Sequence, residues 1–149
     1  MITAIAIDDE PLALALIQAY ADKVEGLDLR KTFTRTSEAR QYLQDFPVDL
    51  IFLDIRMPDI SGIEFYKAAG GDRLVIFTTA YNQYAVTGFD LKAVDYLLKP
   101  FTFERFTQAV TQAQIQQQAK QAQAVPEQRF VQVRAEYSLL NIPLADILY

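Results

Sequence analysis

The chain has 149 residues, a formal net charge of −5, and neither cysteine nor histidine. The missing cysteine excludes disulfides, thiol catalysis and thiolate metal sites, and the missing histidine excludes imidazole ligands and Ser-His catalysis. Any metal is therefore expected to be held by oxygen atoms, which favours magnesium, calcium or manganese. The acidic charge argues against a general nucleic-acid-binding surface on this chain.

The length suggests one domain, or one domain with a piece of a second. Apolar residues make up 51% of the chain, enough to form a sizeable core. No run of apolar residues is long enough to span a bilayer, so no membrane partner is expected. Met1-Ile2-Thr3-Ala4 lacks the pattern of a signal peptide. These features fit a cytoplasmic location.

Five apolar runs with the character of strands alternate with stretches of helical periodicity. The second run alternates apolar and polar residues, which predicts a strand with one wet face near a sheet edge. The third run is continuously apolar and predicts a strand buried on both faces. In chain order, the predicted strands are residues 2–7, 27–33, 48–55, 74–78 and 93–98.

Proline and glycine mark several boundaries of the predicted helices. Pro11 suits the first turn of the first helix, where its missing N–H costs nothing. Helical spacing there relates Leu12, Leu16 and Tyr20, with Ala13 and Ile17 alongside. Pro47 ends the second helix and Gly70 the third. The predicted helices are residues 11–20, 37–46, 63–69, a weak one at 82–89, and a last one capped by Thr102 with Phe103, Phe106 and Val110 on its inner face.

This alternation of strands and helices indicates the α/β class. It predicts a doubly wound parallel sheet with helices on both faces and right-handed crossovers. We expect a flavodoxin-like (βα)5 fold with strand order 2-1-3-4-5, a C-terminal helical extension and a short β-like tail. In such sheets, ligands bind beyond the carboxyl ends of the strands, at the point where the strand order reverses.

The composition changes after about residue 112. Eight glutamines lie between Gln112 and Gln128, mixed with alanine, and predict that the last helix extends as a connector until Pro126. Residues 129–149 regain a strand-like pattern, but about twenty residues are too few for a core of their own. We therefore expect a domain over residues 1–115, a linker over 116–128 and the incomplete start of a second domain over 129–149.

Acidic residues follow two strands that the predicted order makes neighbours. Asp8 and Asp9 end the first strand and Asp54 ends the third, so their carboxylates are expected to meet at the switch point. Carboxylates so close repel one another, and a divalent cation relieves that repulsion. Magnesium usually takes one or two carboxylates together with waters and phosphate oxygens. The pattern therefore predicts a magnesium site that phosphate completes.

Two further groups end neighbouring strands. The hydroxyl of Thr79 and the charge of Lys99 can clamp the oxygens of a phosphoryl group carried by Asp54, and a carboxylate can be a covalent phosphate acceptor. Each residue type alone is more often a cap, loop or surface residue, but four converging strand ends favour a phosphoryl site. Other residues are assigned ordinary capping, solvation or packing roles: Asp49, Asp59, Asp95 and, judged alone, Tyr96.

With these residues, the sequence resembles the receiver domains of bacterial two-component response regulators. The resemblance covers residues 1–115 and is specific as a set. Within the family, three segments resemble the branch whose output is a LytTR DNA-binding domain: residues 8–11, 78–81 and 95–101. Residues 129–149 resemble the opening strands of such a domain. The matching stretches are Asp8-Asp9-Glu10-Pro11, Leu53-Asp54-Ile55-Arg56-Met57-Pro58 with Ser61-Gly62, Thr78-Thr79-Ala80, and Val94-Asp95-Tyr96-Leu97-Leu98-Lys99-Pro100-Phe101.

The resemblance implies that Asp54 accepts the phosphoryl group. It implies that Mg²⁺ is bound by Asp54, Asp9 and the backbone carbonyl of Arg56, with Asp8 supporting the metal. The donor would be a phosphohistidine on a separate sensor histidine kinase, which fits the absence of histidine here. The chain would then be a signalling switch and not a turnover enzyme.

The resemblance also implies a mechanism of output. Thr79 and Lys99 would bind the phosphoryl group, and Tyr96 would turn inward when Thr79 moves toward phosphate. This would reshape the face of helix four, strand five and helix five, through which a homodimer would form. The Lys99–Pro100 bond would be cis, and DNA would be bound only through a full-length output domain.

Two bulky residues stand at less typical positions for this family. Arg56 lies beside the acceptor and Tyr81 beside the threonine, where side chains can shield a phosphoryl group from water. We expect both to slow its hydrolysis.

Three alternative functions remain open. A haloacid-dehalogenase-like phosphatase would need an aspartate two residues after the nucleophile, where Arg56 stands. A flavodoxin-like cofactor binder would need a hydroxyl- or glycine-rich loop after the first strand, but the acids at 8–10 would repel phosphate. A dimerisation module without phosphorylation is disfavoured because every expected site position is present.

Overall fold

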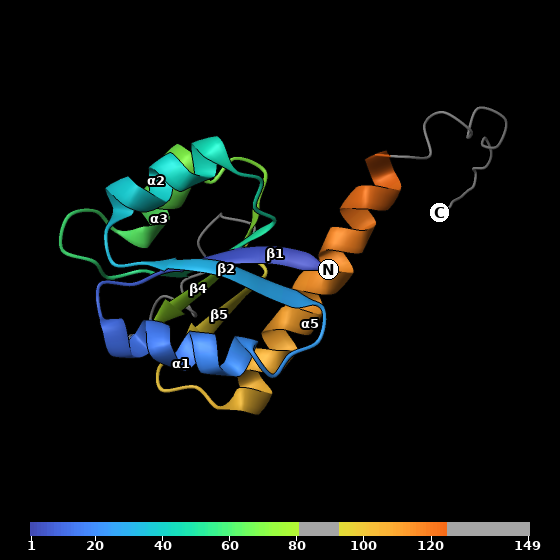
Figure 1. The fold of residues 1–149 in the computed structure, drawn as a ribbon, viewed down its shortest axis with the longest axis horizontal. Coiled ribbons are helices and arrows are strands. Elements are labelled where there is room, and N and C mark those ends of the chain that lie inside the picture. The colour runs from blue at the N-terminus through green and yellow to red at the C-terminus, as the bar shows by residue number, and fades with distance from the viewer. Residues whose placement is uncertain (81–92, 125–149) are drawn as a thin grey trace, which may run out of the picture. The chain divides into compact units, whose positions relative to one another are not determined.

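The computed structural model describes residues 1–80 and 93–124. Five parallel strands form one sheet in the order β2-β1-β3-β4-β5, which confirms the predicted fold (Figure 1). The predicted helix at 82–89 and the strand-like residues 129–149 lie outside the described residues. The strands are β1 Ile2–Ile7, β2 Leu27–Phe33, β3 Leu50–Asp54, β4 Leu74–Thr79 and β5 Asp95–Leu98.

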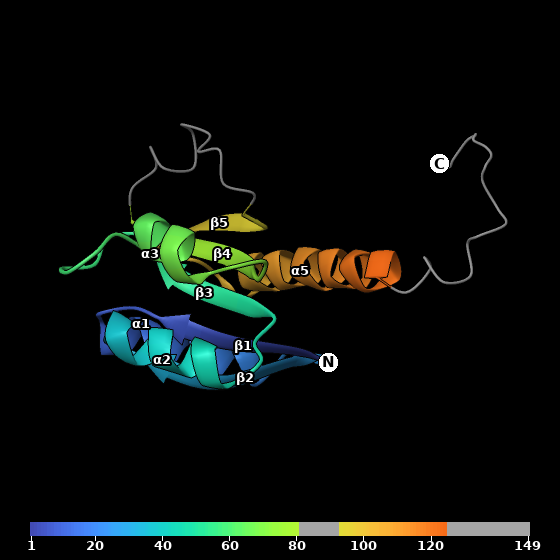
Figure 2. The same ribbon diagram turned by 90° about the horizontal axis from the view of Figure 1, so that it is seen from above.

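Four described helices cover the two faces of this sheet. Figure 1 shows α1 and α5 on one face and α2 and α3 on the other, as a doubly wound sheet requires, and Figure 2 gives the same elements from above. The bounds are α1 Pro11–Ala21, α2 Thr36–Asp45, α3 Gly62–Ala69 and α5 Phe103–Ala124.

The central strand β3 separates two hydrophobic cores. All its residues are buried, and because successive side chains point to opposite faces, they alternate between the cores. Leu50 and Phe52 pack on the side of α1 and α5, where Phe52 stacks on Phe106 with ring centroids 5.2 Å apart. Ile51 and Leu53 pack on the side of α2 and α3. The edge strand β2 has exposed residues at its centre, as its alternating pattern predicted.

The first helix forms where predicted, but Leu12 and Leu16 of the predicted stripe are not on its buried face, whereas Ile17 beside them is buried. Leu14, Ile17 and Ala21 are buried, whereas Leu12 is 86% exposed and Leu16 37% exposed. The helix carries aliphatic residues on almost every side, so spacing alone does not select a face. Packing against the sheet and α5 makes that selection.

The last helix begins and continues as expected. The Thr102 hydroxyl accepts a hydrogen bond from the Arg105 N–H at 3.1 Å, which confirms the cap. Phe106 and Val110 are buried, and Phe103 is half-buried against Tyr20 with ring centroids 5.5 Å apart. The helix runs without a break into the glutamine-rich segment as far as Ala124.

Two glutamines near the start of this segment bind the body of the fold. Gln114 Nε2 donates to the Glu25 carbonyl, and Gln117 Nε2 donates to the Asp49 carboxylate, each at 3.2 Å. Asp49 also accepts hydrogen bonds from the backbone N–H and the hydroxyl of Thr3, each at 3.0 Å. The chain divides into two compact units, Met1–Gln117 and Gln118–Tyr149, so both contacts lie within the first unit.

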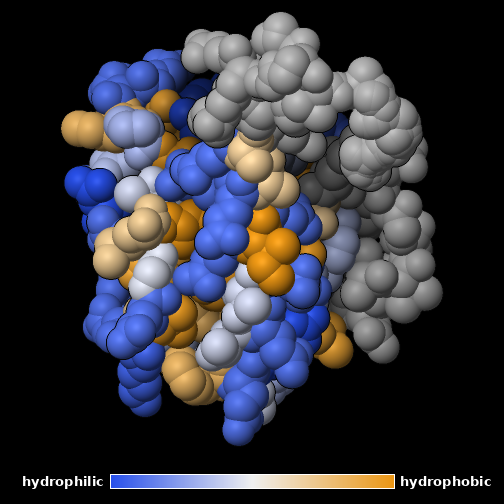
Figure 3. All heavy atoms as spheres, turned by 90° about the vertical axis from the view of Figure 1, so that its right-hand side faces the viewer, coloured by the Kyte–Doolittle hydropathy of each residue, from blue (hydrophilic) through white to orange (hydrophobic). Residues whose placement is uncertain are grey.

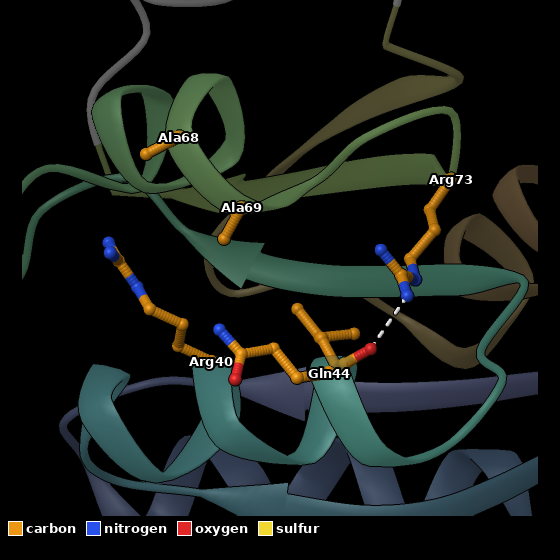
Figure 4. Close-up of a pocket in the computed structure, with 6 residues that line it drawn as sticks. Arg40, Gln44, Ala68, Ala69 and Arg73 are labelled. Atoms are coloured by element: carbon orange, nitrogen blue, oxygen red, sulfur yellow. Dashed lines mark hydrogen bonds between the residues drawn. The ribbon is translucent and has the colours of Figure 1, made fainter.

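The guanidinium of Arg73 donates hydrogen bonds to backbone carbonyls at the carboxyl ends of α2 and α3. It donates to the Leu43 carbonyl at 2.9 Å, the bond dashed in Figure 4, and to the Gly70 carbonyl at 3.3 Å. The Leu43 carbonyl lies four residues before Pro47, which has no N–H to donate, so Arg73 supplies the missing donor. A hollow of about 240 Å³ beside it is lined by Arg40, Leu43, Gln44, Ala68, Ala69 and Arg73.

The surface is of mixed character. On the face drawn in Figure 3, hydrophobic side chains lie between hydrophilic ones, as is usual because polar atoms cannot cover a whole protein. Within residues 1–80 and 93–124, no helix has the length and apolar character needed to cross a membrane.

Gly62 is the first residue of α3 and lies directly against the end of β3. An added Cβ would collide with the Asp54 carbonyl oxygen and lie 3.1 Å from Ile55 Cα. Backbone atoms cannot move aside without shifting the strand or the helix. Gly62→Ala is therefore expected to lower the free energy of unfolding by about 2–3 kcal/mol, measured by urea denaturation.

The control is Lys67→Ala, on the exposed side of the same helix. It should change the free energy of unfolding by less than about 0.5 kcal/mol. Equal losses in the two variants would show that the close approach at Gly62 is not the cause.

Candidate functional site

The three predicted acids lie together at the carboxyl ends of β1 and β3. One carboxylate oxygen from each of Asp8, Asp9 and Asp54 lies within 4.8 Å of those of the other two. The two strands pair in parallel up to Ile7 and Leu53, which brings the residues that follow side by side. Asp8 is fully buried and Asp54 is 4% exposed, so water screens their charges poorly.

Two further strand ends complete the site. Lys99 follows β5, and its Nζ lies 2.8 Å from Asp8 Oδ2 and 3.5 Å from Asp54 Oδ1. Thr79 is the last residue of β4 and is fully buried, and its carbonyl accepts the Lys99 backbone N–H at 2.7 Å. The Lys99–Pro100 peptide is cis, in agreement with the family resemblance. The structure thus brings together the predicted residues from four strands.

The surroundings of Asp54 favour its protonated form when no metal is bound. Burial, the charge of Asp8 and a hydrogen bond with Asp9 raise the pKa of Asp54 to about 7, although Lys99 and the backbone N–H of Arg56 act in the opposite direction. The site therefore contains more negative charge than Lys99 compensates. A hard divalent cation bound by oxygen fits this uncompensated charge.

Lys99 remains charged in this site. Burial by itself would lower the pKa of its ammonium group, but the hydrogen bond with Asp8 and the charges of Asp54, Asp8 and Glu10 outweigh burial, so the pKa of Lys99 is raised. A permanent positive charge therefore lies beside the phosphoacceptor candidate.

Tyr96 lies on β5, which pairs with β4. Its ring stacks on Phe77 with centroids 5.5 Å apart, and Phe77 lies two residues before Thr79. Its hydroxyl is buried and has no hydrogen-bond partner in the described part of the chain, and burial raises the pKa of Tyr96. The neighbouring Asp95 forms a two-pronged ion pair with Arg105 at 2.8 Å for both contacts.

One contact near the site was missed by the sequence analysis, which gave Asp59 an ordinary role. The Thr36 hydroxyl donates to Asp59 Oδ2 at 2.7 Å and so joins the start of α2 to the loop after β3. The partners are 23 residues apart, and no spacing rule pairs the start of a helix with a loop over such a distance. Arg56 is exposed, and Tyr81 lies outside the described residues, so their shielding role stays a prediction.

The raised pKa of Asp54 predicts how the stability of the metal-free protein depends on pH. A carboxyl group with a higher pKa in the folded state than in the unfolded state stabilises the fold fully only below its unfolded value near 4, and this stabilisation is lost as the pH rises to about 7. In EDTA, Asp54→Asn should therefore be more stable than the wild type at pH 8, by roughly 1–3 kcal/mol, and the difference should shrink toward pH 4.

Urea denaturation of both proteins at pH 4, 6 and 8 measures this difference. Repeating the wild-type series in saturating Mg²⁺ is the control, because a bound cation should remove most of the pH-dependent loss. A difference between the two proteins that stays constant with pH would contradict the assignment of the titration to Asp54.

Comparison with known proteins places this site in a family. Residues 4–111 match the family described as the response regulator receiver domain. The sensory transduction protein LytT of Bacillus anthracis is 28% identical over 160 residues, covering 100% of this chain and 65% of that protein. The sensory transduction protein LytR of Staphylococcus haemolyticus is 36% identical over 113 residues, covering 74% of this chain and 44% of that protein. The chain thus spans about half to two-thirds of the length of these relatives.

Solved structures agree with this match. The response regulatory domain of mrkE from Klebsiella pneumoniae is similar with a TM-score of 0.69 and 26% identity, over 76% of this chain and 96% of that one. The response regulator TrrA from Thermotoga maritima, in complex with Mg²⁺ and BeF, is similar with a TM-score of 0.65 and 29% identity, over 76% of this chain and 99% of that one. Because the family match includes every strand-end residue of the site, the chain belongs to the response regulator receiver domain family and is related to the LytT and LytR proteins.

Proposed function

We propose that this receiver accepts a phosphoryl group on Asp54 from the phosphohistidine of a sensor histidine kinase, in a reaction that needs Mg²⁺. The observation that carries the proposal is the convergence of three carboxylates and one ammonium group at the carboxyl ends of β1, β3 and β5. A buried carboxylate beside a fixed positive charge, with further acids to hold a metal, meets the main electrostatic needs of phosphoryl transfer.

The transfer conserves atoms and charge in one displacement. An oxygen of the Asp54 carboxylate forms a bond to phosphorus while the bond between phosphorus and the donor imidazole nitrogen breaks, and the electron pair leaves with that nitrogen. Lys99 Nζ, which lies 3.5 Å from Asp54 Oδ1, would bind one phosphoryl oxygen, and the Thr79 hydroxyl would bind another. Bound magnesium supplies positive charge to the phosphoryl oxygens.

The contacts of the acids support a division of labour around the metal. Both oxygens of Asp8 already accept hydrogen bonds, one from Lys99 Nζ at 2.8 Å and one from the Glu10 N–H at 2.9 Å. This suits Asp8 to support the metal from the second coordination sphere. Asp9, Asp54 and the backbone carbonyl of Arg56 would then bind Mg²⁺ directly.

An apolar surface beside the site supports a protein as the donor. Leu12 and Leu16, which the core of the fold does not use, are exposed on α1. We propose that the sensor kinase docks on this surface and so brings its phosphohistidine to Asp54. A hollow of about 210 Å³ there is lined by Glu10, Leu12, Ala13, Leu16, Ile17, Lys99, Pro100 and Phe101.

The conformational change that follows phosphorylation would be transmitted from the site through β5. Tyr96 is half-buried beside β4, and its hydroxyl has no partner among residues 1–80 and 93–124, so a change in Thr79 could alter the preferred position of its ring. We propose that this reshapes the face formed by helix four, β5 and α5, through which two copies dimerise. Residues 129–149 would begin a LytTR-type output domain that binds DNA only when it is complete, and the protein would act as a cytoplasmic switch without enzymatic turnover.

The first test is phosphorylation of the chain by acetyl phosphate, followed by intact mass. We expect a gain of one phosphoryl group that requires Mg²⁺ and is lost in Asp54→Asn, because Asp54 is the acceptor carboxylate. Asp49→Asn is the matched control, since this acid lies just before β3, at the opposite end of the strand from Asp54. A gain that survives in Asp54→Asn, or steady hydrolysis of a chromogenic phosphate ester, would contradict the proposal.

The docking surface has a separate test. Leu12→Asp should slow phosphoryl transfer from the histidine domain of a partner kinase by about tenfold, since a charge there opposes apolar contact worth about 1.4 kcal/mol. Phosphorylation by acetyl phosphate should be unchanged because that donor needs no docking. Ile115→Asp, at a residue of α5 that is 53% exposed, is the control. If the leucine variant is slowed equally with both donors, the surface is not a docking site.

A further inference from the structure

The loop of residues 56–61, which joins β3 to α3, lies against the phosphoacceptor. At its start, the backbone N–H of Arg56 is close enough to the Asp54 carboxylate to lower its pKa. At its end, the Gly62 N–H donates to the Ile55 carbonyl at 2.8 Å, which closes the loop. The position of the loop therefore determines where the Arg56 backbone faces the acceptor.

A single side-chain hydrogen bond ties the middle of this loop to another element. Asp59 Oδ2 accepts from the hydroxyl of Thr36, the first residue of α2, at 2.7 Å. The distance is typical of a hydroxyl bonded to a carboxylate, which is stronger than a bond between neutral groups. The carboxylate also lies at the amino end of a helix, where negative charge is favoured. Thr36 is 9% exposed and Asp59 is exposed, so burial shields the hydroxyl side of the bond from water.

The loop has apolar support as well, but that support is less directional. Met57 and Ile60 are partly buried and pack against the core on the side of α2 and α3. Such contacts limit the distance of the loop from the sheet, whereas a short hydrogen bond to a fixed helix end also restricts its orientation. Losing the bond should widen the range of loop positions while α2 and α3 stay packed through their own buried residues.

We propose that Thr36 and Asp59 are positioning residues for the metal and phosphoryl site, acting through the backbone of Arg56. The inference rests on the proposed function of Asp54. Neither side chain belongs to the acidic cluster of Asp8, Asp9 and Asp54. Their bond holds the loop in place before the metal arrives, so less ordering is required when Mg²⁺ binds.

Calorimetric titration of the full chain with Mg²⁺ tests this inference without any phosphorylation. Thr36→Val removes the hydroxyl at nearly constant volume and should weaken Mg²⁺ binding about tenfold, as loss of an outer-sphere contact commonly does. Thr36→Ser retains a hydroxyl and should keep binding close to that of the wild type. Thr36→Val combined with Asp59→Ala should be no weaker than either single variant, because both remove the same bond.

The matched control is Thr3→Val. It removes a bond of the same chemistry, from the Thr3 hydroxyl to the Asp49 carboxylate at 3.0 Å, in a part of the fold that holds no metal candidate. Its Mg²⁺ affinity should equal that of the wild type. Equal weakening in Thr3→Val and Thr36→Val would overturn the inference, as would unchanged Mg²⁺ binding in a folded Thr36→Val protein.

The kinetics of phosphorylation by acetyl phosphate distinguish positioning from chemistry. In Thr36→Val the Mg²⁺ concentration that gives half-maximal rate should rise about tenfold, while the rate at saturating Mg²⁺ should stay near that of the wild type. A fall in the saturated rate with no change in the half-maximal Mg²⁺ concentration would contradict a positioning role. If Thr36→Val does not fold, Asp59→Ala, which alters only an exposed loop residue, gives the same measurement.

Failure of this inference is distinguishable from failure of the proposed function. If the wild type binds Mg²⁺ and is phosphorylated on Asp54, but the Thr36 and Asp59 variants bind Mg²⁺ equally well, only the positioning role is lost. If the wild type gains no phosphoryl group, or gains one that Asp54→Asn retains, the proposed function is lost as well.

Discussion

Electrostatic repulsion among Asp8, Asp9 and Asp54 is the constraint on which the rest of this structure depends. Two of the three carboxylates are buried, where their charges interact strongly, and the only lysine at the described site lies 2.8 Å from one and 3.5 Å from another. Burial, together with the charge of Asp8 that Lys99 only partly offsets, raises the pKa of Asp54 to about 7. A divalent cation bound by oxygen would relieve this unfavourable arrangement, in accord with the proposed switch.

The hydrophobic packing of the sheet offsets the unfavourable repulsion within the cluster of Asp8, Asp9 and Asp54. The strand that carries Asp54 is buried on both faces, between a core shared with α1 and α5 and a core shared with α2 and α3. Gly62 lets α3 start against the backbone of the same strand, so the loop that follows Asp54 is short and closed. These contacts hold the backbone of Asp54 in place, while its carboxylate lies among the other acids of the site.

The two ends of the central strand have different contacts. At its carboxyl end lie the acids, Lys99 and the loop that Thr36 and Asp59 hold. Just before its amino end, Asp49 joins Thr3 of β1 to Gln117 of α5 through hydrogen bonds. A helix expected to lead to an output domain is thus fastened to the sheet at a point away from the chemistry. A conformational change in β5 or α5 would therefore occur relative to an α5 that stays bound to the sheet at Asp49.

Much of this arrangement could be predicted from the sequence because it depends on local chemistry. Apolar runs of strand length, the proline at the start of α1 and the Thr102 cap each act within a few residues, and they predicted the strands and the described helices. The strand order was expected from the doubly wound fold type that this alternation indicates, and the structure confirms it. Parallel strands place their carboxyl ends on one edge, so Asp54 and Lys99 were expected to converge although they are far apart in the chain.

The sequence by itself determined the α/β class and the set of strand-end residues, whereas the sheet order was expected from the fold type that this pattern resembles. Tertiary structure alone decided three other properties. It selected Leu14 and Ile17 as the buried face of α1, because a helix that is aliphatic nearly all round has no preferred side until it packs. It joined Thr36 to Asp59, because a contact between the start of α2 and the loop before α3 depends on how both helices pack on the sheet. It also set the pKa of Asp54, because burial and the distances between charges exist only in the folded chain.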